Sequence, residues 1–236
     1  MEEINVNIEN YIIKLLICVE FKIEKSFIWY IKNYNMTIIG LCGNKRAGKD
    51  TFADHLMTLH EGIQKYSFAG PLKEACRIIF CLNNEQIDGS LKETLDERWG
   101  LSPRQMFQTF GTDLVRNQYS KLVPGTKLEE VGAAFWVYRF QVWYKQWKKE
   151  NPDKILIITD IRFPDELKII KKIGGIIIKI NRPSFKLKDS HISEKNIDNM
   201  TGDYNLTNSG SLQEYKTKIE KMYLTVTKTS DNEQNY

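Results

Sequence analysis

The sequence predicts an α/β fold with a doubly wound, mainly parallel sheet flanked by helices. A β-branched run, a glycine-rich loop and a helix start follow one another in TIIGLCGNKRAGKDT at residues 37–51. A nearly continuous apolar segment, KILIITDIRF at residues 154–163, is typical of a strand that is buried on both faces of a parallel sheet. Strand-like and helix-like segments alternate along the rest of the chain, as βα units do.

The glycine-rich segment at residues 43–51 is typical of a phosphate-binding loop (P-loop). Gly43 and Gly48 allow a tight bend that aims backbone N–H groups inward, while the helix dipole and Lys49 add positive charge. The segment departs from the G-x-x-x-x-G-K-[ST] pattern, because Asp50 occupies the hydroxyl position and Thr51 follows it. Asp50 also suits a helix start by its charge alone. The pattern leaves open whether Asp50 or Thr51, acting through water, holds Mg²⁺.

Length and composition favour a single domain that handles small phosphorylated molecules. The chain has 236 residues, 42% of them hydrophobic, and a net charge of +4, which is too small for a dedicated nucleic-acid binder. Its four cysteines show no C-x-x-C pair, so the sequence predicts neither zinc nor a disulfide framework, and it indicates a reducing compartment. We expect an N-terminal extension of unknown role at 1–35, a catalytic domain at 36–226 and a flexible tail at 227–236.

The apolar extension is not expected to cross a membrane. Lysines and glutamates interrupt it before it reaches about 18 uncharged residues, and its acidic start does not suit a secretory signal.

The remaining elements follow from periodicity and from helix start signals. A helix is expected at 50–60, a strand at 63–70 and a helix from Pro71, which places Lys73 in a first turn where a bound anion would offset its charge. The polar segment 83–101 predicts a lid or insert. Ser102, Pro103 and Gln105 form a helix start. Further helices are expected at 133–149, 163–174 and 211–226, and further strands at 154–163, 175–183 and 203–208.

Two polar residues mark the end of the buried strand at 154–163. Asp160 and Arg162 are two residues apart, so they share a face at the carboxyl end of the strand, where doubly wound sheets bind ligands. Asp160 is placed to hold Mg²⁺ through water, and Arg162 to neutralise phosphate charge. A structural ion pair at a strand end is the alternative. Lys92, Arg98 and Arg104 are scattered cations that either close on phosphates or lie on the surface, and Arg116 flanks the same helix as Arg98 and Arg104.

Seven segments in the same order resemble the deoxynucleoside monophosphate kinases of bacteriophages. The Gly-Lys-Asp-Thr ending of the loop is the form that this family uses. The resemblance covers the chain from Met36 to about Leu224 and leaves residues 1–35 without a counterpart. The segments are GNKRAGKDT at 43–51, YSFAGPLKEA at 66–75, RQMFQTFGTDLVRN at 104–117, TDIRFPDE at 159–166, INRP at 180–183, SHISE at 190–194 and DYNLTNSGSLQE at 203–214.

This resemblance implies a P-loop kinase fold and transfer of the γ-phosphoryl group of ATP, with Mg²⁺, to a deoxynucleoside 5′-monophosphate. It implies catalytic roles for Lys49, Arg104, Asp160 and Arg162, and metal binding by Asp50, Thr51 and Asp160. The cofactor-binding residues would be Gly43, Lys45, Arg46, Ala47, Gly48, Lys49, Asp50 and Thr51. The substrate-binding residues would be Leu72, Lys73, Lys92, Arg104, Gly111, Thr112, Trp136, Asp160 and Arg162.

Some assignments stay open. Lys92 stands where a phage relative would carry arginine, and His191 and Glu194 receive no chemical role. The expected partners are nucleotides, without nucleic acid or membrane, in the cytoplasm of a cell or of a viral host. A homodimer is compatible with the aromatic helix, although a buried core would look the same.

Three other functions remain as alternatives. The nearest is a kinase of another phosphorylated metabolite, similar to phosphomevalonate kinases, which carry a related loop. The others are a nucleic-acid-linked ATPase or regulatory nucleotide-binding module, and a structural or assembly protein with a vestigial site.

Overall fold

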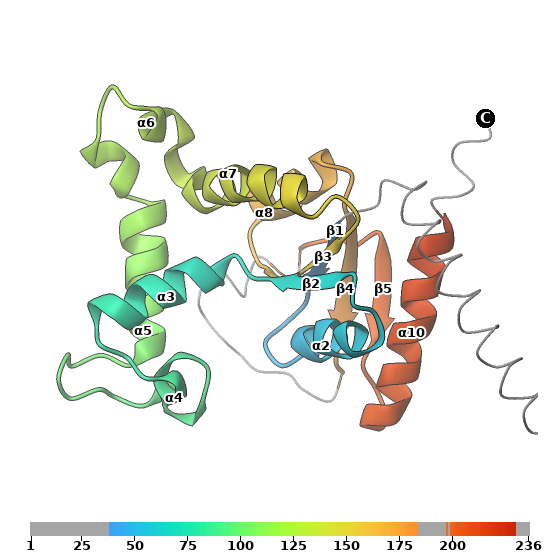
Figure 1. The fold of residues 1–236 in the computed structure, drawn as a ribbon. Coiled ribbons are helices and arrows are strands. Elements are labelled where there is room, and N and C mark those ends of the chain that lie inside the picture. Colours follow the sequence, from blue (N-terminus) through green and yellow to red (C-terminus); the bar gives the residue numbers. More distant parts are fainter. Residues whose placement is uncertain (1–37, 184–196, 198, 230–236) are drawn as a thin grey trace, which may run out of the picture.

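Five parallel strands form the centre of the computed structural model, which describes residues 38–183, 197 and 199–229 (Figure 1). Their order across the sheet is β2-β3-β1-β4-β5. The strands are β1 Ile38–Cys42, β2 Ile63–Tyr66, β3 Ile155–Ile161, β4 Ile176–Asn181 and β5 Tyr204–Thr207. The predicted doubly wound parallel sheet is therefore confirmed.

The order of the strands places β1 where the direction of winding reverses. On one side β1 pairs with β3, with Ile39 opposite Ile157, and on the other it pairs with β4, with Ile39 opposite Ile176. Ligands of open parallel sheets bind beyond the carboxyl ends of the strands at such a reversal. The glycine-rich loop leaves β1 at this point.

Helices cover both faces of the sheet (Figure 1). On one face α2, Lys49–Leu59, and α10, Leu212–Thr229, share a core with β1, β3 and β4. On the other face α7, Phe135–Glu150, and α8, Pro164–Lys172, form a second core. The strands are buried from both sides, which explains their continuous apolar runs.

A lobe with its own small core extends from the sheet (Figure 1). It packs buried apolar side chains such as Cys76, Met106 and Phe107, and it contains the insert predicted at 83–101 but extends beyond it on both sides. Its elements are α3 Ala69–Ile79, α4 Asn84–Ile87, η1 Ser90–Glu93 and α5 Pro103–Gln108. The link to α7 consists of the π-helix η2 Thr109–Arg116, then η3 Tyr119–Leu122, α6 Lys127–Val131 and η4 Gly132–Ala134.

Two predicted boundaries were wrong. The strand expected at 63–70 ends at Tyr66, and α3 begins at Ala69 rather than at Pro71. The physical reason is long-range, because the Asp160 carboxylate accepts hydrogen bonds from the backbone N–H groups of Phe68 and Ala69 and so fixes the helix start. Lys73 is therefore the fifth residue of α3 instead of lying in its first turn.

Other boundaries agree with the sequence. Ser102 caps α5 in a capping box with Gln105, as predicted. Helix α10 reaches Thr229, three residues past the boundary expected at 226. The extension 1–35, His191, Glu194 and residues 230–236 lie outside the described part of the chain. Within the described part, none of the helices combines the length and apolar character that a membrane crossing needs.

Candidate active site

Left-handed backbone shapes the P-loop. Gly43, Arg46 and Gly48 have φ values of 149°, 64° and 105°. Arg46 is notable because a residue with a Cβ pays a steric cost in this region, so surrounding contacts must hold it there. The turn is closed by the N–H of Ala47, which donates to the carbonyl of Asn44 at 3.0 Å.

Lys49 is the first residue of α2 and is only 8% exposed. Its ammonium donates to the carbonyls of Gly43, at 2.6 Å, and Asn44, at 2.9 Å, so it spans the mouth of the loop. The structure thus places the Lys49 ammonium at the P-loop.

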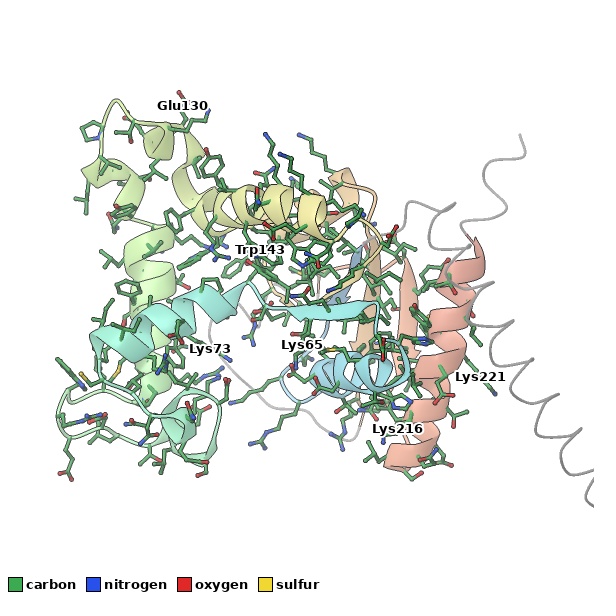
Figure 2. The ribbon with its side chains drawn as sticks, viewed as in Figure 1. Lys65, Lys73, Glu130, Trp143, Lys216 and Lys221 are labelled. Carbon is green, nitrogen blue, oxygen red and sulfur yellow. The ribbon has the colours of Figure 1, made fainter. Side chains whose placement is uncertain are left out.

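Asp50 borders a cleft that Thr51 does not reach. Asp50 borders the large cleft between α2 and the lobe, where its carboxylate lies 2.9 Å from the ammonium of Lys65. Figure 2 shows Lys65 on β2 and Lys73 on α3, which border the same cleft. Thr51 lines a second hollow beside Gly48 and Asn208, which Asp50 also borders. The divergence follows from the 100° step between neighbouring helical residues.

Both carboxylate oxygens of Asp160 accept hydrogen bonds from protein donors. One carboxylate oxygen accepts from Phe68 N at 2.7 Å, and the other accepts from Ser67 Oγ at 2.7 Å and Ala69 N at 2.8 Å. These bonds tie the end of β3 to the start of α3. Asp160 therefore orients the lobe, while its predicted contact with Mg²⁺ through water stays a prediction.

Four cations from four separate elements face the cleft opposite the P-loop: Lys73 on α3, Lys92 on η1, Arg104 on α5 and Arg162 after β3. Burial, with the nearby charges of Lys73, Arg104 and Arg162, lowers the pKa of Lys92 to about 8. Asp88 pairs with Lys73 and Glu93 lies 3.7 Å from Arg104, so these carboxylates offset part of the positive charge, and the four cations outnumber them. The cluster is therefore suited to a phosphate group.

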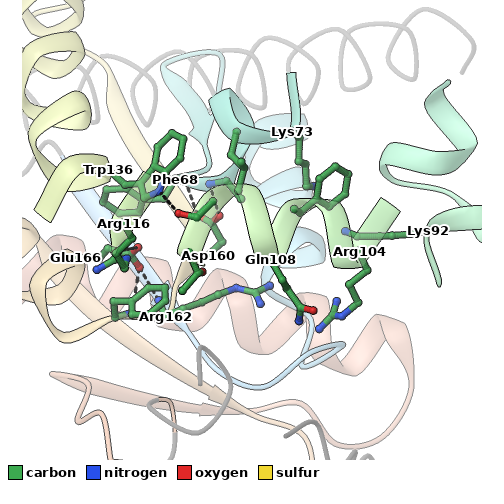
Figure 3. Close-up of a pocket in the computed structure, with 16 residues that line it drawn as sticks. Phe68, Lys73, Lys92, Arg104, Gln108, Arg116, Trp136, Asp160, Arg162 and Glu166 are labelled. Atoms are coloured by element: carbon green, nitrogen blue, oxygen red, sulfur yellow. Dashed lines mark hydrogen bonds and ion pairs between the residues drawn. The ribbon is translucent and has the colours of Figure 1, made fainter. Parts of the chain in front are cut away.

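Next to the cations lies a cavity with an apolar lining (Figure 3). Leu72 and Trp136 line it, together with Phe68, Phe107 and Phe163. The indole N–H of Trp136 donates to the carbonyl of Gly111 at 2.9 Å. A Cβ at Gly111 would lie 2.4 Å from Leu72 Cδ2, so glycine is required where the π-helix meets α3. The predicted residues Leu72, Gly111, Thr112 and Trp136 all border this cavity.

Sequence reasoning gave no site role to two charged residues that line the cavity, Arg116 and Glu166. Arg116 lies over the ring of Phe163, 3.8 Å from its centroid, and donates to Asp165 at 2.8 Å and Glu166 at 3.3 Å. Glu166 also accepts from the N–H groups of Arg162 and Phe163. The Phe-Pro-Asp-Glu helix start is the signal that could have revealed Glu166, since glutamate at that position reaches back to the cap.

The environment of Glu166 changes its acidity. Burial and the charge of Asp160 raise the pKa of Glu166 to about 8, although the Arg162 N–H and Arg116 lower it. By holding Arg116 and the backbone of Arg162, this carboxyl group links the cavity to the cation cluster.

A P-loop at a winding reversal, facing a cluster of cations and an apolar cavity, defines a phosphoryl transferase of the P-loop kinase class. The model of the deoxynucleotide monophosphate kinase family matches residues 81–219. A protein of Acanthamoeba polyphaga mimivirus, to which deoxynucleotide monophosphate kinase activity is ascribed, is 39% identical over 78% of this chain and 94% of its own length. The deoxynucleotide monophosphate kinase of Enterobacteria phage T4 is 24% identical over 78% of this chain and 98% of its own.

Comparison with solved structures gives weaker similarity. Dephospho-CoA kinase from Campylobacter jejuni aligns with a TM-score of 0.41 and 16% identity, over 82% of this chain and 98% of its own. By its family match and its viral relatives, the chain belongs to the deoxynucleotide monophosphate kinase family, and it is a kinase.

Proposed function

We propose that the chain transfers the γ-phosphoryl group of ATP to the 5′-phosphate of a deoxynucleoside monophosphate, with Mg²⁺. The observation that carries this proposal is that the P-loop and the four cations border one cleft from opposite sides. A donor triphosphate on the loop and an acceptor phosphate on the cations would face each other across it. The names of the family and of its viral relatives support the choice of acceptor.

The residues of the cleft would act by aligning the two substrates and by stabilising negative charge on the phosphates. In phosphoryl transfer, negative charge spreads over the equatorial oxygens of a loose transition state. Lys49 and Arg162 would stabilise that charge, while Lys73, Lys92 and Arg104 hold the acceptor phosphate. The acceptor oxygen is already anionic at neutral pH, so the site needs no strong base and no protein nucleophile.

The described side chains could supply only part of a Mg²⁺ coordination shell. Within the described residues there is no group of three acidic, histidine or cysteine side chains that could hold a metal by itself. Mg²⁺ in such enzymes is bound by one or two carboxylates together with substrate phosphates. Asp50, whose carboxylate reaches the cleft, suits that role better than Asp160, whose oxygens accept three hydrogen bonds. Bound there, Mg²⁺ would neutralise charge on the donor phosphates.

The apolar cavity suits the nucleoside part of the acceptor. Its aromatic side chains offer flat faces on which a base can stack, and Gln108, Thr112, Arg116 and Glu166 are among the polar side chains that line it. Trp136, fixed by its bond to Gly111, would form one wall.

An ADP-release assay with ATP, Mg²⁺ and a panel of ribo- and deoxynucleoside monophosphates tests the function. We expect turnover with deoxynucleotides and weaker turnover with the matching ribonucleotides. Absence of activity on all of them, with phosphomevalonate accepted instead, would replace the proposed acceptor. ATP hydrolysis stimulated only by nucleic acid would replace the reaction class.

A further inference from the structure

Two of the seven segments that resemble the phage kinases contribute no residue to the cleft or to the apolar cavity. They are INRP at 180–183 and DYNLTNSGSLQE at 203–214. Both lie at the carboxyl ends of β4 and β5, on the opposite side of β1 from the acceptor cations. Their side chains, with one from α10, reach the outer surface of the P-loop.

Three successive P-loop carbonyls each accept a hydrogen bond from one of these side chains. Arg182 donates to the carbonyl of Arg46 at 3.2 Å, and Asn208 donates through Nδ2 to that of Ala47 at 2.8 Å. The hydroxyl of Tyr215 donates to the carbonyl of Gly48 at 3.1 Å. We call these three side chains, Arg182, Asn208 and Tyr215, the carbonyl clamp.

We infer that the carbonyl clamp holds the P-loop in its phosphate-binding shape, and that Asn208 and Tyr215 are positioning residues for the donor nucleotide. This inference rests on the proposed donor site at the P-loop.

The geometry of the peptide group gives the clamp its effect. In a planar trans peptide, the C=O of one residue and the N–H of the next point in opposite directions. When the clamp holds the carbonyls of Ala47 and Gly48 outward, the N–H groups of Gly48 and Lys49 point to the other side. These N–H groups belong to the loop and helix start that would receive the donor phosphates.

The clamp also accounts for the strained conformation of the loop. Arg46 has a φ of 64°, and its own carbonyl is the one held by Arg182. Gly48 is confined as well, because a Cβ there would lie 2.6 Å from Asn208 Nδ2 and 2.9 Å from the Tyr215 ring. An unfavourable backbone conformation persists when several contacts determine it together.

Both positioning residues are themselves anchored. The backbone N–H of Asn208 donates to the carbonyl of Asn181 at 2.7 Å, which extends the pairing of β5 with β4. Tyr215 is 1% exposed within the core that α2 and α10 share with the sheet. These contacts fix the position of the loop to β4, β5 and α10.

Isosteric variants test the clamp without opening a cavity. Asn208→Asp keeps the shape of the side chain but replaces the donor by a carboxylate that faces a carbonyl, and Tyr215→Phe removes only the hydroxyl. Asn205→Ala is the matched control, because Asn205 is an exposed asparagine on β5, the strand that Asn208 directly follows.

We expect Asn208→Asp to raise KM for ATP and to weaken Mg-ADP binding, each by about tenfold or more, since an unsatisfied carbonyl and a new negative charge both act on the donor site. Tyr215→Phe should produce a smaller change in the same direction. KM for the acceptor should stay within about twofold. Equal effects on both substrates, or unchanged Mg-ADP binding in a folded variant, would overturn the inference.

Hydrogen exchange supplies a readout that does not depend on turnover. In the nucleotide-free protein, amides of residues 43–51 should exchange faster in Asn208→Asp, while those of residues 103–116 exchange at the wild-type rate. Unaltered exchange at 43–51 would contradict the clamp even if the kinetics changed. A wild-type protein without kinase activity would instead contradict the proposed function and leave the exchange result valid.

Discussion

The donor and acceptor sides of the cleft are built in different ways. The donor side consists of nine consecutive residues, 43–51, whose bent backbone presents N–H groups. The acceptor side is assembled from side chains on α3, η1, α5, α7 and the end of β3. The donor side depends on the local backbone shape of the loop, which the carbonyl clamp supports. The acceptor side depends on the fold bringing together charged side chains that are distant in the sequence. The two sides should therefore respond differently to substitution.

Lys49→Ala should have the largest effect, because it removes the one charged side chain of the P-loop that spans the loop mouth. We expect kcat/KM to fall about 100- to 1000-fold, as when a preorganised donor to the transition state is lost. Steady-state ADP release measures this, and circular dichroism verifies folding. Lys221→Ala on α10 is a matched control that should behave as wild type. Near-normal turnover in folded Lys49→Ala would show that the P-loop is not the donor site.

Arg162→Ala should lower kcat by about 100-fold, in the range found for groups that stabilise transition-state charge, while KM for the acceptor changes only a few-fold. The reason is that Arg162 lies between the two sides, where charge develops during transfer. Separate titrations of ATP and acceptor give the two constants. A variant with normal kcat and a raised KM would assign Arg162 to ground-state binding on the acceptor side.

Lys92 should set the highest pH at which the enzyme uses its acceptor efficiently. Its lowered pKa of about 8 means that the ammonium is charged below that pH and neutral above it. The wild-type kcat/KM for the acceptor should therefore fall about tenfold by pH 9, given one decade of deprotonation per pH unit. Lys92→Arg, which stays charged, should retain activity there. An identical fall in the arginine variant would assign the limit to another group.

Glu166→Gln should have the smallest effect on turnover and a characteristic effect on stability. Folding raises the pKa of Glu166 from 4.5 in the unfolded chain to about 8, so protonation of Glu166 stabilises the folded state. This contribution to the free energy of unfolding is fully present below pH 4.5 and is lost as the pH rises through 8. Melting temperatures from pH 5 to 8 should therefore fall more in wild type than in Glu166→Gln. Glu61→Gln, at an exposed position, should follow wild type. Parallel curves for all three proteins would show that Glu166 is ionised throughout.

The sequence predicted the parts of the site that depend on neighbouring residues. The P-loop, the buried strand that ends in Asp160 and the capping box at Ser102 were each found where expected. It also grouped Lys73, Lys92, Arg104 and Arg162 through family resemblance, and the structure brings them to one cleft. It did not predict the three hydrogen bonds to Asp160, which moved the start of α3 by two residues.

The difference has a physical cause. Glycine positions, apolar runs and caps act over a few residues, so the sequence alone determined the loop, the parallel sheet and most helix boundaries. The bond from Arg116 to Glu166 joins residues 50 positions apart, and that from Asn208 to Ala47 joins residues 161 apart. Only tertiary packing decides which distant groups meet and which of them lose water. The acidity of Glu166 and the support of the P-loop were therefore decided by the tertiary structure.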